Sequence, residues 1–341
     1  MLRKSALLSI GFSIFMAGSV LAQTPDAPRI SYESVPDFMK MPDGMYMGEA
    51  MGVATNSQGE FYVFNRNGEA TRLFQFDASG NFMREIGKGL YGFAFAHAVR
   101  VDADDNIWVV DEGTDMVIKF NPEGRVMMTI GRRPEAQQLR ETPGRGGGPP
   151  NQRPYNFGRP TDIGWDPQGN IFVTDGYTNS RVVKYDPEGR YLGEVGTRGS
   201  EIGQLSTPHS MSMDAEGNVY VGDRGNRRVQ VFDNDLNFLR MIEGVGAPWA
   251  VCVSPGPHQY LFSSNSNTTG NSKESYDNAG EIYKMELDGT IIGRFGTGGK
   301  RLGEFGSVHA IDCRNPDELL VAEITTWRVQ KLLLDPRMTS Q

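Results

Sequence analysis

The segment "TDIGWDPQGNIFVTDGYTNSRVVKYDPEG", residues 161–189, decides the fold. It contains three short runs rich in Ile, Val, Phe and Tyr, and Asp-Pro-x-Gly sequences interrupt these runs. β-Branched and aromatic residues favour strands, whereas Asp-Pro-x-Gly favours tight turns. A fourth run, "YLGEVG" at 191–196, follows directly. The segment therefore predicts four consecutive antiparallel strands.

The first part of this unit recurs along the chain. Its six copies read "MGVATNSQGE" (51–60), "HAVRVDADDN" (97–106), "TDIGWDPQGN" (161–170), "HSMSMDAEGN" (209–218), "WAVCVSPGPH" (249–258) and "HAIDCRNPDE" (309–318). Four-stranded units of about 40 to 45 residues are typical of propeller blades. We therefore predict an all-β protein, a six-bladed β-propeller of four-stranded antiparallel blades over residues 48–336, with insertions in blades two and five.

Three of the four histidines stand at the first position of a copy. His97, His209 and His309 open copies two, four and six, so closing the ring relates them by an approximate threefold axis. Neutral imidazole is the usual zinc ligand, and three histidines leave a coordination position open for water or substrate. The pattern predicts a site for zinc or another first-row divalent metal. The alternative is three structural histidines in the core.

Three further side chains are expected at the same mouth of the ring. In a blade, the start of the innermost strand and the loop between the second and third strands lie at one end. Arg66, Tyr177 and Arg224 fall on such loops. Two guanidiniums suit a carboxylate-bearing substrate, because each binds a carboxylate bidentately. Tyr177 adds a phenol whose pKa a nearby metal or arginine would depress toward a useful value.

A polar residue ends the second run of most copies. The residues concerned are Asn65, Asp111, Asp175, Asp223 and Glu323. They occur in copies with and without histidine, so we interpret them as acceptors for backbone donors of the next loop, rather than as a second metal or acid/base site. Three arginines near the third runs are interpreted as structural in the same way: Arg181, Arg228 and Arg328.

Composition fits one large exported domain. The chain has 341 residues, with 42 Gly, 19 Pro and 38% hydrophobic residues. Residues 1–22 combine a basic start, an apolar stretch and a small-residue cleavage site, which predicts a signal peptide and a periplasmic or extracellular location. A membrane anchor is the alternative, but the apolar stretch is short for a span. A net charge of −8 disfavours nucleic acid as a partner.

Two further segments and the cysteines carry expectations of their own. We expect the segment 23–47 to supply a strand that helps close the ring. Residues 132–160 lead into blade three at the mouth, as a lid or as a disordered loop. Cys252 and Cys313 lie on the innermost strands of copies five and six and face across one seam, either as a disulfide or as two buried thiols.

The blade pattern resembles NHL repeats, and residues 48–334 resemble the lyase domain of peptidylglycine α-amidating enzymes. The resemblance rests on residues 160–189, "TPHSMSMD" (207–214) and "GDRGNRRVQVF" (222–232). That family cleaves peptidyl-α-hydroxyglycine to a peptide amide and glyoxylate with zinc, three histidines, a tyrosine and arginines. The resemblance implies zinc ligands at His97, His209 and His309 and catalytic roles for Tyr177, Arg66 and Arg224.

The chain also departs from that family. A methionine two residues before the third histidine is Ser307 here, and the aspartate after that histidine, which helps hold a structural calcium, is Ala310. Alanine at position 310 argues against a structural calcium site. The cysteines that form disulfides in the family are also absent. The expected activity is that of a metal-dependent carbon–nitrogen lyase acting on a small carboxylate-bearing or peptide-derived substrate. The alternatives are an NHL-repeat binding propeller without catalysis and a gluconolactonase-like metal-dependent hydrolase, for which a carboxylate-and-amide metal site would be expected.

Overall fold

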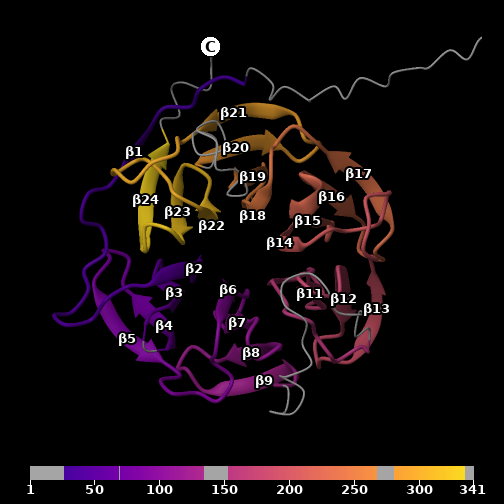
Figure 1. Ribbon diagram of the computed structural model, residues 1–341, viewed down its shortest axis with the longest axis horizontal. Helices are drawn as coiled ribbons and strands as arrows, with labels where there is room; N and C mark the ends of the chain where they lie inside the picture. The colour runs from indigo at the N-terminus through magenta and orange to yellow at the C-terminus, as the bar shows by residue number, and fades with distance from the viewer. Residues whose placement is uncertain (1–26, 69, 134–152, 267–279, 335–341) are drawn as a thin grey trace, which may run out of the picture.

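The computed structural model describes residues 27–68, 70–133, 153–266 and 280–334. Within them, 24 strands form six four-stranded antiparallel sheets, arranged as a ring with β2, β6, β14, β18 and β22 around the centre (Figure 1). The predicted six-bladed, all-β propeller is therefore confirmed. The expected signal peptide at 1–22 lies outside the described residues, as does most of the expected lid, 134–152. No described helix is long and apolar enough to cross a membrane.

The first three blades follow chain order from the inside outwards. Blade one contains β2 (Glu49–Thr55), β3 (Phe61–Arg66), β4 (Thr71–Phe76) and β5 (Phe82–Ile86). Blade two contains β6 (Ala96–Val101), β7 (Ile107–Asp111), β8 (Met116–Phe120) and β9 (Val126–Gly131). Blade three contains β10 (Asp162–Trp165), β11 (Ile171–Asp175), β12 (Arg181–Tyr185) and β13 (Tyr191–Val195).

Blades four and five repeat this order, and blade six combines both ends of the described chain. Blade four contains β14 (Pro208–Met213), β15 (Val219–Asp223), β16 (Arg228–Phe232) and β17 (Phe238–Ile242). Blade five contains β18 (Pro248–Val253), β19 (Tyr260–Asn265), β20 (Glu281–Glu286) and β21 (Ile291–Phe295). Blade six contains β22 (Val308–Asn315), β23 (Glu318–Glu323), β24 (Arg328–Leu334) and β1 (Tyr32–Ser34).

The N-terminal strand closes the ring. β1 pairs antiparallel with β24, with Tyr32 opposite Leu334 and Ser34 opposite Leu332. The outermost strand of blade six thus comes from the start of the chain and the other three from its end. Opening the ring at this blade therefore breaks a backbone ladder as well as side-chain packing.

The turn between the first two strands of a blade is built from the Asp-x-x-Gly-Asn pattern. In blade three, Asp166 Oδ1 accepts hydrogen bonds from the backbone N–H groups of Gln168 and Asn170. Gly169 has a φ of 82°, in the left-handed region that glycine adopts without a steric cost. Blade two places Asp105 at the equivalent position with a φ of 62°, which Asp tolerates better than most residues.

The polar residue at the end of the second strand anchors the loop from the preceding blade. Asp223 accepts the backbone N–H of Ser206 at 2.7 Å and the Nε–H of Arg228 at 2.8 Å. Arg228 then donates to the carbonyl oxygens of Ser200, Glu201 and Gln204. Asp175 with Arg181 forms an equivalent buried pair, and Glu323 with Arg328 forms one in which the arginine is partly exposed. The interpretation as backbone acceptors is confirmed for the four carboxylates of the set, whereas Asn65 differs, because its Nδ2 donates to the carbonyl oxygen of Arg72.

The hydrophobic core lies in the seams between neighbouring blades. Phe64 of blade one packs in one cluster with Ile118 and Phe120 of blade two. On its other face, blade one contributes Phe74 to a cluster with Leu320 of blade six. Each sheet is therefore covered on both faces, which explains why its strands are apolar at nearly every position.

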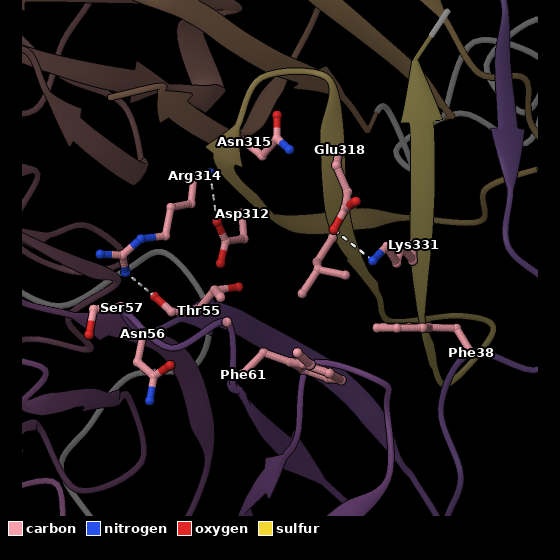
Figure 2. A pocket seen from close by; sticks show the side chains of 13 residues that line it. Phe38, Thr55, Asn56, Ser57, Phe61, Asp312, Arg314, Asn315, Glu318 and Lys331 are labelled. Atoms are coloured by element: carbon pink, nitrogen blue, oxygen red, sulfur yellow. Dashed lines mark hydrogen bonds and ion pairs between the residues drawn. The ribbon is translucent and has the colours of Figure 1, made fainter. Parts of the chain in front are cut away.

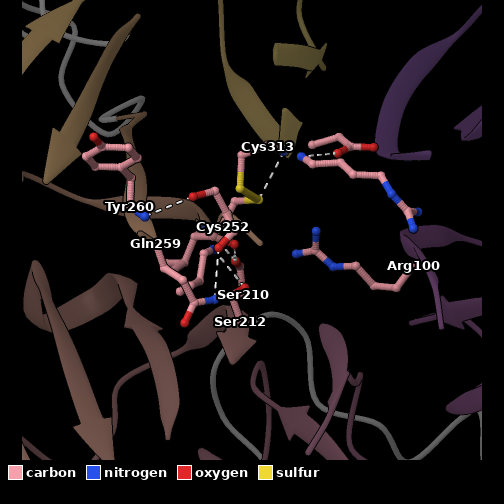
Figure 3. The surroundings of a disulfide bond; sticks show 12 residues. Arg100, Ser210, Ser212, Cys252, Gln259, Tyr260 and Cys313 are labelled. Carbon is pink, nitrogen blue, oxygen red and sulfur yellow. Dashed lines mark hydrogen bonds between the residues drawn. A yellow bond between two sulfur atoms is a disulfide. The ribbon is translucent and has the colours of Figure 1, made fainter. Parts of the chain in front are cut away.

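Blades five and six are also joined covalently. Cys252 on β18 and Cys313 on β22 form a disulfide with a Cα–Cα distance of 6.1 Å (Figure 3). Of the two alternatives for this pair, the structure has the disulfide. It connects the innermost strands, so it holds the seam closed near the central channel.

Candidate metal centre

Each of the three expected ligands lies at an irregularity of an innermost strand. The pairing register shifts between Ala96 and Ala98, and equivalent shifts flank His209 in β14 and His309 in β22. A β-bulge leaves one residue outside the ladder and re-aims its side chain. The bulge therefore turns each imidazole toward the axis of the ring.

The three imidazoles form a nearly equilateral triangle. Their ring centroids are separated by 4.7 Å, 4.7 Å and 4.8 Å. Their candidate ligand nitrogens all lie within 4.8 Å of one another, and all three side chains are buried. The sequence-derived expectation that the histidines meet on one axis thus agrees with the geometry.

Backbone carbonyls determine which imidazole nitrogen faces the centre. The Nδ1 atoms of His97, His209 and His309 lie 2.6 Å, 2.7 Å and 2.5 Å from the carbonyl oxygens of Thr161, Trp249 and Met51. A carbonyl oxygen only accepts, so each Nδ1 carries the hydrogen and each Nε2 keeps a lone pair. This arrangement is typical of metal-ligating histidines, whose other nitrogen is oriented by a second group.

Burial keeps these imidazoles neutral. Desolvation is the main cause that holds the pKa values of His97 and His209 well below the ordinary 6.5. Desolvation and the charge of Arg66 lower the pKa of His309 to about 3. Neutral imidazoles are the form that binds a metal.

One ligand nitrogen has no partner within the described protein. His309 Nε2 is buried and makes no hydrogen bond. A buried polar atom without a partner is costly, and a metal ion would satisfy it. Two nitrogens bound to one zinc lie at most about 4.2 Å apart, so the rings would move slightly closer on binding. The donor set therefore fits a first-row divalent metal.

Tyr177 lies directly beside the histidines. It sits between β11 and β12, and its hydroxyl oxygen is 3.1 Å from His209 Nε2 and 3.3 Å from His97 Nε2. Its single hydrogen can be donated to only one of the two. Burial raises the pKa of the phenol, because this effect outweighs Arg224 and Arg66, which lower it. Of the two expected causes of a depressed pKa, a metal or an arginine, the arginines are outweighed by burial.

The two predicted arginines lie at the mouth in different states. Arg224, in the 3₁₀ turn Arg224–Asn226, stacks on Trp249 at 4.7 Å and on Tyr177 at 5.4 Å. Arg66 instead donates to the carbonyl oxygen of Ala96 at 2.8 Å and pairs with Glu112 at 3.1 Å. The guanidinium of Arg224 makes no hydrogen bond within the described residues, so its N–H donors are left for a ligand.

Two charged residues of the site were missed by the sequence reasoning. Glu112 is 3% exposed and pairs with Arg66 and with Arg159 at 3.0 Å. Arg159 lies over the ring of Tyr177 at 4.5 Å. Glu112 follows Asp111 as Arg66 follows Asn65, so the positional rule that identified the arginine also identifies this carboxylate. Arg159 sits in the connection to blade three and follows no repeat position.

The space on the axis beside the histidines is small. The cavity bounded by the three histidines and the strands below them has a volume of about 10 Å³, close to that of one water molecule. A larger cleft of about 290 Å³ lies between blades one and six, at the far ends of β2 and β22 (Figure 2). β22 has His309 of the candidate metal centre as its second residue and ends in this cleft at Asn315, so the cleft is separate from the centre.

Sequence comparisons agree with this architecture. A family model for the NHL repeat matches residues 205–232. The Mus musculus peptidyl-glycine alpha-amidating monooxygenase is 27% identical over 259 residues, which cover 65% of this chain and 24% of that protein. A probable peptidyl-alpha-hydroxyglycine alpha-amidating lyase of Caenorhabditis elegans is 26% identical over 214 residues, covering 56% and 57%. The chain thus matches about a quarter of the mouse protein and somewhat over half of the nematode protein.

Other similar proteins include an NHL repeat-containing protein and two solved propeller structures. The Mus musculus NHL repeat-containing protein 3 is 30% identical over 228 residues, covering 64% of this chain and 60% of that protein. Among solved structures, a gluconolactonase from Xanthomonas campestris has a TM-score of 0.59 at 16% identity, covering 91% of this chain and 95% of that chain. A streptogramin B lyase has a TM-score of 0.56 at 14% identity, covering 90% and 98%.

At such low identity the two structures establish the fold alone. The family model adds one segment of NHL type, residues 205–232, and the curated relatives are similar over part of the ring. The chain is therefore a six-bladed β-propeller that contains a match to the NHL repeat and resembles the peptidyl-α-hydroxyglycine α-amidating lyases.

Proposed function

We propose that this protein is an exported, metal-dependent carbon–nitrogen lyase that converts an α-hydroxyglycine derivative into an amide and glyoxylate. One observation carries the proposal. The imidazoles of His97, His209 and His309 form a triangle of neutral donors, and the Tyr177 hydroxyl lies within hydrogen-bonding distance of two of them. The similar proteins named as amidating lyases support the same reaction class.

The three histidines would hold zinc or another first-row divalent ion through their Nε2 atoms. Such an ion, when bound, acts as a Lewis acid that polarises the substrate hydroxyl and lowers the pKa of nearby acidic groups. The tautomers needed for this role are already set by the three backbone carbonyls. The binding step therefore requires no proton to leave an imidazole.

Arg224 would bind the substrate carboxylate. Its guanidinium is stacked between two aromatic rings and makes no hydrogen bond within the described residues. A guanidinium donates two parallel hydrogen bonds to a carboxylate, which fixes both position and orientation. Holding the carboxylate at Arg224 places the neighbouring carbon and its hydroxyl toward Tyr177 and the histidines.

Tyr177, as its phenolate, would receive the hydroxyl proton of the substrate. The electron pair of that O–H bond becomes the new carbon–oxygen double bond of glyoxylate, while the carbon–nitrogen bond breaks. The electron pair of the broken carbon–nitrogen bond goes to the amide nitrogen, which takes up the proton that Tyr177 holds. The proton lost by the substrate hydroxyl thus becomes the new amide hydrogen, so the reaction needs no external oxidant or reductant.

The test is glyoxylate release from α-hydroxyhippurate by the zinc-loaded protein. We expect benzamide and glyoxylate in equal amounts, and loss of turnover after chelation. Hydrolysis of gluconolactone without glyoxylate release would favour the hydrolase alternative. Turnover of neither compound by the zinc-loaded protein would favour a binding propeller without catalysis.

A further inference from the structure

The carboxylate of Glu112 is divided between two environments. Its Oε1 accepts from Arg66 at 3.1 Å and from Arg159 at 3.0 Å. Its Oε2 is buried and has no hydrogen-bond partner within the described protein, and it lies 3.9 Å from His97 Nε2. Pairing with two arginines therefore accounts for one oxygen of this side chain and leaves the other unexplained.

A second buried atom without a partner belongs to the imidazole next to His97. His309 Nε2 is buried without a hydrogen bond, and the ring of His97 is 4.7 Å from the ring of His309. Buried polar atoms in folded proteins are almost always satisfied, so the oxygen 3.9 Å from His97 Nε2 and the free nitrogen of the adjacent ring each indicate a missing partner. A cation satisfies both an imidazole lone pair and a carboxylate oxygen.

The charges around the histidines favour the same partner. Each of the three imidazoles donates from Nδ1 to a backbone carbonyl and turns Nε2 to the centre, and the guanidiniums of Arg66, Arg159 and Arg224 lie around them. A divalent ion placed among these groups would be repelled by three positive charges. An anionic oxygen facing the ion offsets that repulsion, and the effect is large because the site excludes water.

We propose that Glu112 is a fourth protein group of the metal centre, with Oε2 binding the ion alongside the three imidazoles and Oε1 held by Arg66 and Arg159. The substrate hydroxyl would then enter as a fifth ligand, a coordination number that catalytic zinc can reach. The inference rests on the proposed metal centre and extends it. The two arginines are positioning residues in this arrangement, because they orient a ligand rather than touch the ion. Hydrogen bonds of this kind to a ligating carboxylate are common at metal sites.

The chain offers a matched control for this carboxylate. Glu49 also pairs with Arg66, at 3.4 Å, but its side chain is 37% exposed. The substitutions Glu112→Gln and Glu49→Gln each remove one negative charge from the same guanidinium while preserving side-chain volume. Only the first removes an oxygen that faces the histidines.

The experiment measures zinc affinity by competition with a chromophoric chelator, without substrate, in the otherwise complete chain. We expect Glu112→Gln to weaken zinc binding about 10- to 100-fold and Glu49→Gln to leave it unchanged. Thermal unfolding of the metal-free proteins establishes that both variants are folded. Equal zinc affinity in Glu112→Gln and in a wild type that binds zinc would overturn the inference.

A second variant covers the case in which Glu112→Gln does not fold. Glu112→Asp keeps the charge and the arginine pairing but withdraws the carboxylate by one methylene. We expect weaker zinc binding, and wild-type affinity in a folded Glu112→Asp protein would contradict the contact. A wild type that binds no zinc would remove the metal centre and the proposed function together, whereas zinc binding without glyoxylate release would remove only the lyase activity.

Discussion

His97 donates from Nδ1 to the carbonyl oxygen of Thr161, 2.6 Å away, and Thr161 occupies in blade three the repeat position that His97 occupies in blade two. The same relationship joins His209 to Trp249 and His309 to Met51. Blades with histidine thus alternate with blades that supply the carbonyl. This alternation orients three imidazoles identically and explains why histidine occurs in every second copy and not in all six.

Replacing any one of the three histidines with alanine should remove most of the bound metal. A site with two imidazoles lacks the coordination number for which the other two rings are oriented. Metal content after purification and zinc loading, measured by elemental analysis, checks this. His258→Ala is the control, since this imidazole is 62% exposed and pairs with Glu286 far from the centre in sequence and fold. Full metal content in a His209→Ala protein would contradict the site.

Much of this centre could be predicted from the sequence, because the repeat converts position in the chain into position in space. The copies fixed six blades, and the shared position of His97, His209 and His309 placed them on one axis. The geometry of a four-stranded blade also predicted that Arg66, Tyr177 and Arg224 lie at the same end of the ring as the histidines. The alternation of side chains between the two faces of a strand also predicted that Cys252 and Cys313 face each other. The sequence left open whether they form a disulfide or two free thiols, and the structure has the disulfide.

The remainder depends on contacts that no repeat encodes. Arg159 reaches Tyr177 from a connection whose path is not periodic. Glu112 occupies a predictable position, but its role follows from having one oxygen paired and the other unpaired, which only packing determines. The pKa of Tyr177 rises because burial outweighs the arginines, and a balance of two opposing effects cannot be read from residue types.

Removing the disulfide should lower stability without altering zinc binding. The paired substitutions Cys252→Ala and Cys313→Ala release a loop of 61 residues, for which the expected loss is about 2–4 kcal/mol. Urea unfolding of the oxidised wild type and the double variant measures the difference. A loss near zero would mean that the β1–β24 ladder and the seam packing alone hold blade six in place.

Asp115 should make the stability of the protein fall as pH rises. Burial, with smaller contributions from Asp175 and Asp111, raises the pKa of this carboxyl to about 7. Between pH 4 and pH 7 the folded protein therefore keeps a proton that the unfolded chain has released. Stability is lost over this window, by about 1.4 kcal/mol for each unit by which the folded pKa exceeds the unfolded one.

The substitution Asp115→Asn removes this dependence. Asparagine tolerates the φ of 55° at this position and keeps an oxygen to accept the N–H of Arg159. We expect the variant and the wild type to unfold alike near pH 4 and the variant to be more stable above pH 7. Thermal unfolding of both proteins across this range, with chelator present throughout, makes the comparison, and parallel profiles would contradict it.

Arg224 should matter more for substrate binding than Arg66. Arg224→Gln removes unpaired donors, and losing charge-assisted hydrogen bonds of about 1.5–3 kcal/mol corresponds to a KM for α-hydroxyhippurate raised about 10- to 100-fold. A fall in kcat as well would mean that the contact strengthens in the transition state. Arg227→Gln, in the same loop, is the control. Arg66→Gln should also destabilise the protein, because it leaves Glu112 with one fewer partner.

Tyr177→Phe should lower kcat strongly and leave metal content intact. The substitution removes the hydroxyl that lies 3.1 Å from His209 Nε2 but keeps the ring on which Arg159 and Arg224 stack. Loss of a general base typically costs about 10²- to 10⁴-fold in rate. The measurement is glyoxylate release per bound zinc, so a change in metal loading cannot be mistaken for a change in chemistry. Tyr46→Phe, at a tyrosine that is 74% exposed, is the control. Full activity in the zinc-loaded Tyr177→Phe protein would assign the proton transfer to another group, and the buried carboxylate of Glu112 would then be the next group to test.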